Sequence, residues 1–148
     1  MELYSDEYFM KQALKEAKEA LENDEIPIGA IVVAQNRIIG KGHNQVEQLS
    51  DTTAHAEMIA ITSAMSYLGS KYLKDCTLFV TLEPCTMCAG ALYWSQLARV
   101  VYGAEDSKRG FMRYGKSVLH PKSKLEYGIL SEECGQLLTD YFKRKRER

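Results

Sequence analysis

Several features are scarce in this sequence of 148 residues, and each scarcity excludes a class of protein. No apolar run approaches the roughly 18 residues of a membrane-spanning helix, so we expect no membrane association. The first ten residues carry three acids and no apolar core, which predicts no signal peptide and a cytoplasmic protein. Only four cysteines are present, and without a secretory signal they do not indicate a disulfide framework.

An excess of charge of one sign is also missing, since 19 basic and 20 acidic residues give a net charge of −1. A neutral total would argue against a nucleic-acid partner, but the charges are unevenly spread. Residues 1–25 hold eight acids and three lysines, whereas residues 143–148 hold five bases and one acid. Such a basic end either contacts phosphates or complements the dipole of a helix.

Length and composition are those of a globular protein, with 45% hydrophobic and 26% charged residues. We therefore expect a single domain over residues 1–148. Apolar periodicity predicts helices over 5–23, 54–68, 86–96 and 131–145, and strands over 26–33, 37–41, 76–82, 99–103 and, more weakly, 124–130. The first two strands are expected to form a hairpin, and the later alternation predicts parallel strands with helices on both faces.

The ends of two helices show capping patterns. Ser5 is expected to cap the first helix, and Asp51, Thr52 or Thr53 the second, which Gly69 would end. Residues 42–53 are predicted to form a polar loop, and residues 104–123 are the least regular stretch.

The cysteines fall into two groups. Cys76 and Cys134 lie within a strand and a helix and are expected to be buried as small apolar residues. Cys85 and Cys88 form a Cys-x-x-Cys motif after Pro84 at the start of a helix, where the dipole favours thiolates. Taken alone, this motif fits a redox pair, half of a structural zinc site, or packing.

His55, in His55-Ala56-Glu57, offers a third ligand beside the two cysteines. Three protein ligands leave one zinc position open, which is typical of a catalytic site. His55 and Glu57 would lie about 200° apart around a helix, so they can share a site only at its first turn. We therefore expect two helix N-termini to converge on one metal ion.

Such a site would lower the pKa of a zinc-bound water toward about 7. Glu57 would carry the proton from this water to the ring nitrogen and the leaving amine. The order His-x-Glu…Pro-Cys-x-x-Cys is the known signature of zinc nucleobase deaminases. The other two histidines, His43 and His120, are expected to be surface or packing residues.

Longer motifs resemble the bacterial tRNA-specific adenosine deaminases of the cytidine deaminase-like superfamily, and the resemblance covers nearly the whole chain. The matching segments are Glu25-Ile-Pro-Ile-Gly-Ala-Ile31, Asn44, Thr53-Ala-His-Ala-Glu-Met58, Thr81-Leu-Glu-Pro-Cys-Thr-Met-Cys-Ala-Gly-Ala91, and Arg99-Val-Val-Tyr-Gly-Ala104 with Asp106 and Lys108. The short motif of metal ligands is shared by the superfamily, whereas the longer blocks are more specific to the tRNA branch.

The resemblance implies an α/β fold, a three-layer α/β/α sandwich around a five-stranded mixed sheet, acting as a homodimer. It implies that zinc-bound hydroxide attacks C6 of the wobble adenosine in a tRNA anticodon stem-loop, giving inosine. One Zn²⁺ per subunit would be held by His55, Cys85 and Cys88. Glu57 would be the catalytic proton shuttle, and Asn44, Ala56 and Asp106 would bind substrate.

Between Lys108 and Leu125 the sequence departs from the family pattern. Its basic and aromatic residues there suit RNA contact or an ordinary solvated loop. Two other functions therefore stay open: deamination of free guanine, cytosine, adenosine or another nucleoside, and a zinc-stabilised RNA-binding module without activity. Glu83 either faces substrate or braces its loop, with bracing favoured, and Tyr93, Trp94 and Leu97 either pack or form a dimer face.

Overall fold

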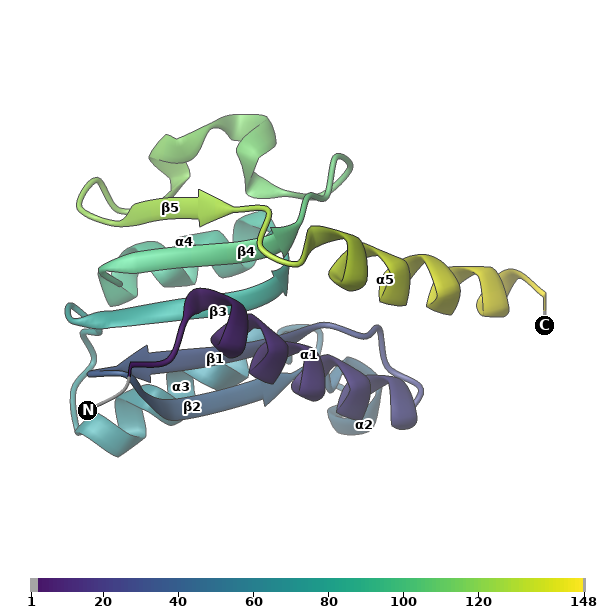
Figure 1. The fold of residues 1–148 in the computed structure, drawn as a ribbon, viewed down its shortest axis with the longest axis horizontal. Coiled ribbons are helices and arrows are strands. Elements are labelled where there is room, and N and C mark those ends of the chain that lie inside the picture. The colour runs from purple at the N-terminus through teal and green to yellow at the C-terminus, as the bar shows by residue number, and fades with distance from the viewer. Residues whose placement is uncertain (1–2, 148) are drawn as a thin grey trace.

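Five strands form one mixed sheet in the order β2-β1-β3-β4-β5 (Figure 1). The computed structural model describes residues 3–147. The two pairs that involve β1 are antiparallel, and the β3–β4 and β4–β5 pairs are parallel. The strands are β1 (Gly29–Ala34), β2 (Arg37–His43), β3 (Cys76–Leu82), β4 (Arg99–Ala104) and β5 (Lys124–Tyr127). The predicted hairpin and the predicted parallel strands are both confirmed.

Helices cover both faces of this sheet, which makes the three-layer sandwich that the resemblance implies (Figure 1). The helices are α1 (Asp6–Glu22), the single turn α2 (Val46–Leu49), α3 (Ala56–Leu68), α4 (Thr86–Ser95) and α5 (Ser131–Arg146). Two short 3₁₀ helices, η1 (Phe111–Tyr114) and η2 (Lys116–Val118), lie in the stretch predicted to be irregular. Among the residues described, no helix has the length and apolarity to cross a membrane.

Alternating side chains of the strands build two separate cores. On β3, Leu78 and Val80 pack with α3 and α4, whereas Phe79 between them packs with α1. This alternation follows the pleat of a strand, and a strand buried on both faces reads as a continuous apolar run. The apolar run 76–82 therefore predicted the strand, and burial in two cores explains why the run contains so few polar residues.

The first strand begins later than predicted. Residues 26–28 are apolar, but Pro27 lacks a backbone N–H, and the N–H of Ile28 bonds to the carbonyl of Ile26 in a tight turn. The strand starts at Gly29, where an added Cβ would lie 2.1 Å from the carbonyl oxygen of Ala13. Helix α1 packs so closely here that only glycine fits.

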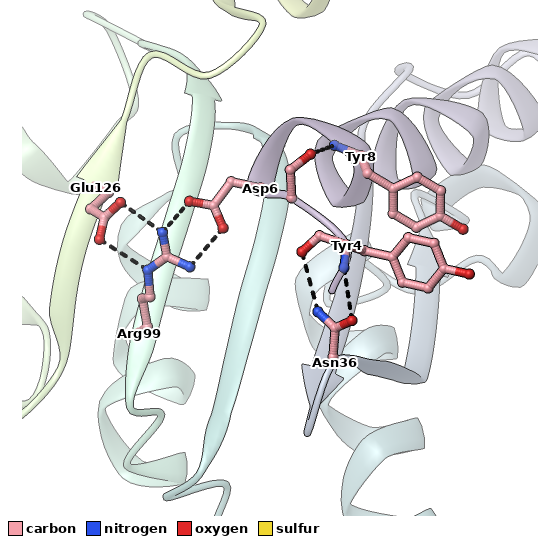
Figure 2. A network of polar contacts seen from close by, with 7 residues as sticks. Tyr4, Asp6, Tyr8, Asn36, Arg99 and Glu126 are labelled. Atoms are coloured by element: carbon pink, nitrogen blue, oxygen red, sulfur yellow. Dashed lines mark hydrogen bonds and ion pairs between the residues drawn. The ribbon is translucent and has the colours of Figure 1, made fainter. Parts of the chain in front are cut away.

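The sheet's amino end carries an ion-pair network centred on Arg99 (Figure 2). The Arg99 guanidinium bonds both carboxylate oxygens of Glu126 on β5, at 3.0 and 2.7 Å, and both oxygens of Asp6 in the first turn of α1. Nearby, the side chain of Asn36 bonds the N–H and the carbonyl of Tyr4, and Ser5 caps α1 by accepting from the N–H of Tyr8, as predicted. This network ties the first helix to two strands.

Candidate active site

Two helix N-termini meet at the other end of the sheet, beyond the carboxyl end of β3. His55 is the N-cap of α3 and Cys85 is the N-cap of α4, both with extended backbones. Because His55 precedes the first helical residue, its side chain and that of Glu57 reach the same site. The expected end-on arrangement is confirmed, and it places the positive ends of two helix dipoles at one point.

The three candidate metal ligands lie at distances that suit zinc. Nδ1 of His55 is 3.6 Å from Sγ of Cys85 and 3.5 Å from Sγ of Cys88, and all three atoms lie within 4.8 Å of one another. Tetrahedral bonds of about 2.3 Å to sulfur and about 2.0 Å to nitrogen would separate nitrogen from sulfur by about 3.5 Å. The donors therefore fit a zinc ion and leave its fourth position free.

The hydrogen bond between the two cysteines shifts their pKa values in opposite directions. The pKa of Cys85 falls to about 4, chiefly because the Cys88 thiol donates a hydrogen bond to it and, next, because His55 does. The pKa of Cys88 is raised, because it is the donor of that bond and is buried. Zinc needs both sulfurs as thiolates, so metal binding displaces the proton held between them.

Glu57 lies in the first turn of α3 with only 4% of its surface exposed. Burial raises its pKa to about 7. A carboxyl group with such a pKa both accepts and donates protons near neutral pH, as a general acid–base catalyst must. The thiolate of Cys85 acts in the same direction, and the charge of His55 opposes it.

A cleft of about 950 Å³ opens over the site. It is large enough for a nucleoside together with neighbouring groups. The lining includes three reactive residues, four bases, two aromatic residues and four further acids: His55, Glu57 and Cys85; Lys108, Arg109, Lys145 and Arg146; Tyr141 and Phe142; and Glu25, Glu47, Glu83 and Asp106. Since Glu25 and Glu83 are buried while Lys108, Arg109 and Arg146 are exposed, the cleft combines reactive groups with exposed bases that can contact a polyanion.

Two of the predicted substrate residues are bonded to each other. Oδ1 of Asn44, a side chain with 5% of its surface exposed, accepts the N–H of Ala56 at 2.9 Å. His55 holds the N-cap position but makes no capping bond with its side chain, and Asn44 supplies that bond from a distance. The prediction that one of residues 51–53 caps α3 was wrong. Asp51 instead accepts bonds from the N–H and hydroxyl of Thr53. Asn44 still lines the cleft beside His55.

Asp106, the third predicted substrate residue, also lines the cleft. Its Oδ1 accepts the N–H groups of Lys108 and Arg109, which fixes the turn that carries these two bases. Glu83 accepts the N–H groups of Asp106 and Met112, at 3.1 and 3.0 Å, which confirms the predicted bracing role, and Glu83 also lines the cleft.

The remaining candidates lie outside the metal cluster. Cys76 and Cys134 are buried, His43 lies 3.4 Å from Glu16, and His120 packs on the ring of Tyr93, all as predicted. Leu97 is buried, whereas Trp94 is 75% exposed and does not pack in the core.

Sequence reasoning missed the contribution of α5 to the cleft. Leu138, Tyr141 and Phe142 line the cleft, although their helical spacing is also that of an ordinary core face. Glu25, within a matched motif, lines it as well. The sequence did offer one signal for this contribution: the adjacent aromatic residues Tyr141 and Phe142 directly precede the basic residues 143–146.

Comparison with known proteins agrees with this geometry. Residues 3–104 match the model of the cytidine and deoxycytidylate deaminase zinc-binding region. The chain is 48% identical over 145 residues to a tRNA-specific adenosine deaminase of Aquifex aeolicus, covering 95% of each. It is 43% identical over 148 residues to that of Bacillus subtilis, covering 97% of this chain and 92% of the relative.

Solved structures of deaminases share this fold. One from a study of A-to-I editing by tRNA:A34 deaminases superposes with a TM-score of 0.83 and 39% identity, covering 88% of this chain and 99% of that one. Guanine deaminase from Bacillus subtilis follows with a TM-score of 0.66 and 42% identity, over 69% and 66% of the two chains. The chain belongs to the zinc-binding cytidine and deoxycytidylate deaminase family, among the relatives of the tRNA-specific adenosine deaminases.

Proposed function

We propose that this protein hydrolytically deaminates the wobble adenosine of a tRNA anticodon to inosine, releasing ammonia. The observation that carries the proposal is the buried Glu57 beside a zinc-fitting ligand set, in a cleft also lined by basic and aromatic residues. Relatives of 40–48% identity over nearly the whole chain are tRNA-specific adenosine deaminases, which supports the choice of substrate. The activity would then reside in the cytoplasm, where tRNA serves translation.

Each group of the site has a distinct role in this reaction. Zinc, when held by His55, Cys85 and Cys88, lowers the pKa of water and so supplies the nucleophile at neutral pH. Glu57 accepts the proton of that water and passes protons to the purine ring nitrogen and to the departing amine. Burial of Glu57, which raises the pKa of its carboxyl group, favours its uptake of that proton.

Substrate contacts follow from the lining of the cleft. Asn44 holds the adenosine beside His55, and the backbone N–H of Ala56 contributes by fixing the Asn44 side chain. Asp106 contacts the adenosine from the turn that follows β4. Lys108, Arg109 and Arg146 face the phosphates of the anticodon loop, together with Lys145, whose Nζ also pairs with Asp24 at 2.9 Å. The target base must leave its stack to reach Glu57, and aromatic side chains that line the cleft favour unstacked bases.

We further propose that the protein is a homodimer. Met87 and Trp94 lie seven residues apart, two turns along the same face of α4, and 37% and 75% of their surfaces are exposed. An aromatic residue in an exposed apolar patch is typical of an interface. Sedimentation should show a dimer, and Trp94→Glu should give monomers, whereas Tyr67→Glu at the end of α3 serves as the exposed aromatic control.

The second candidate function is deamination of a free base, favoured by the 42% identity to a guanine deaminase. The test is a parallel assay of an anticodon stem-loop, free adenosine, cytosine and guanine. We expect inosine in the stem-loop at the wobble position. If the protein rapidly deaminates a free base and does not deaminate the stem-loop, the second candidate function replaces the first. If it deaminates none of these substrates, the result indicates an RNA-binding module.

A further inference from the structure

Besides helix α5, two short segments bound the cleft on two of its sides. On one side lies α2, which follows the edge strand β2, and on the other lies the segment 105–112, which follows β4. The metal cluster at the end of β3 lies between these strands in the sheet order. Each segment is held by one buried carboxylate, Glu25 for α2 and Glu83 for 105–112.

Glu25 caps α2 from a distant part of the chain. Its Oε1 accepts the N–H of Glu47 at 3.1 Å and its Oε2 accepts the N–H of Gln48 at 2.7 Å, while only 2% of the residue is exposed. Gln45, the residue at the N-cap position itself, makes no side-chain bond to the helix. A single turn of helix has little stability of its own, so this carboxylate decides where α2 lies.

Glu83 holds the other segment in the same way. One oxygen accepts the N–H of Asp106 and the other accepts that of Met112, six residues further along. Gly110 allows this arrangement, because an added Cβ there would lie 1.8 Å from Oε2 of Glu83. Glu83 is 5% exposed, so water does not replace these bonds.

Neither carboxylate has a cationic partner in an ion pair within residues 3–147. Each charge is balanced instead by two backbone N–H donors, one for each oxygen. A glutamine side chain has the same shape but only one acceptor oxygen, and its NH₂ would face an N–H donor. The two sites therefore require a carboxylate for its two acceptors.

Because the two carboxylates hold opposite sides of one cleft, we propose that Glu25 and Glu83 are positioning residues that fix the two side walls of the substrate cleft. Through α2, Glu25 places Val46 and Glu47, and through the segment 105–112, Glu83 places Asp106, Lys108 and Arg109. The walls determine how tightly the RNA strand binds and leave the metal ligands and Glu57 in place. This inference rests on the proposed function, because it names a part of the same site.

The test uses Glu25→Gln and Glu83→Gln in the zinc-loaded full chain, with Glu22→Gln and Glu19→Gln, both exposed on α1 and outside the cleft, as matched charge controls. Each of the first two variants should raise KM for the anticodon stem-loop about tenfold, as expected for one lost charge-assisted bond, with kcat changed less than about twofold. Zinc content should stay at one per chain. The controls should keep wild-type KM.

Amide hydrogen exchange supplies a readout that does not depend on activity. In Glu25→Gln the amides of Glu47 and Gln48 should exchange faster while those of Asp106 and Met112 stay protected, and Glu83→Gln should show the reverse. A wild-type KM in both variants, with only a lower melting temperature, would overturn the inference. If the wild type did not deaminate the stem-loop, the proposed function would be overturned instead. Hydrogen exchange would then still show whether Glu25 and Glu83 hold the two walls.

Discussion

Two polar clusters lie at the two ends of the same sheet, and they differ in what completes them; Figure 2 draws the one at the amino end. At the amino end, the charge of Arg99 is matched by Asp6 and Glu126, so the protein supplies every partner. At the carboxyl end, two thiols, an imidazole and a buried carboxyl group converge without a countercharge from Lys or Arg among the described ion pairs. A cluster that the chain completes holds the fold together, whereas one left for a metal and a substrate to complete carries the reaction.

Removing a metal ligand should produce the largest effect. Cys88→Ala leaves two ligands, so zinc content should fall to near zero and deamination to background. Metal analysis and a stem-loop assay check this. Cys76→Ala is the matched control, since Cys76 is a buried cysteine outside the cluster and its variant should keep one zinc per chain. Full zinc content in Cys88→Ala would show that the cluster is not the metal site.

Removing the proton carrier should leave the metal in place. Glu57→Gln keeps the shape of the side chain but cannot take up a proton, so kcat should fall by roughly 10²–10⁴-fold. Zinc content should match the wild type, and Glu22→Gln on the exposed face of α1 should retain full activity. Comparable kcat values for Glu57→Gln and the wild type would remove Glu57 from the mechanism.

The bases that line the cleft should matter less than its reactive residues. Replacing Lys145 and Arg146 by glutamine should raise KM for the stem-loop several-fold and reduce its salt dependence, with a log–log slope lower by about 1.4 for two lost phosphate contacts. Lys71 and Lys74, exposed in the loop before β3, form the matched double control. An unchanged salt slope in the variant of Lys145 and Arg146 would mean that these two bases contact no phosphate.

The smallest effect is expected at the other end of the sheet. Arg99→Met should lower the free energy of unfolding by about 1 kcal/mol, because the pairs are partly solvent-exposed, and leave kcat and zinc content unchanged. Arg99 lowers the pKa of Glu126. The stabilisation should therefore be present above the ordinary glutamate pKa of about 4.3 and be lost as the pH falls below it.

Urea titrations at several pH values measure this difference. Lys11→Met, which breaks an exposed pair of 3.7 Å within α1, should cost less than Arg99→Met. A large loss of activity in Arg99→Met at unchanged zinc content would contradict the separation of structural and catalytic roles between the two ends.

The sequence predicted most of the fold because its strongest signals are local. The apolar runs of β1, β3 and β4 and the periodicity of α1 and α3 each reflect burial against the sheet, so the element order follows from patterns of a few residues. The metal ligands were found in the same way, because two short motifs at helix starts carry them. The start of β1 was misplaced, since Pro27 lies in an apolar run that looks like a strand.

What the sequence did not predict depends on contacts between distant residues. Helix α2 exists because Glu25 caps it from 22 residues away, and α3 is capped by Asn44 rather than by its own neighbours. The part of α5 that reaches the cleft has the same amphipathic pattern as a helix buried in the core. A local sequence pattern does not show which distant residue caps a helix or which part of a helix reaches the cleft, because tertiary packing determines both.

Zinc K-edge X-ray absorption of the purified protein tests the central claim most directly, namely that a metal completes the carboxyl-end cluster. We expect one zinc per chain bound by two sulfur atoms and one imidazole nitrogen, with a light fourth ligand, in both the wild type and Glu57→Gln. A shell of four sulfurs, or of nitrogen and oxygen alone, would contradict this claim.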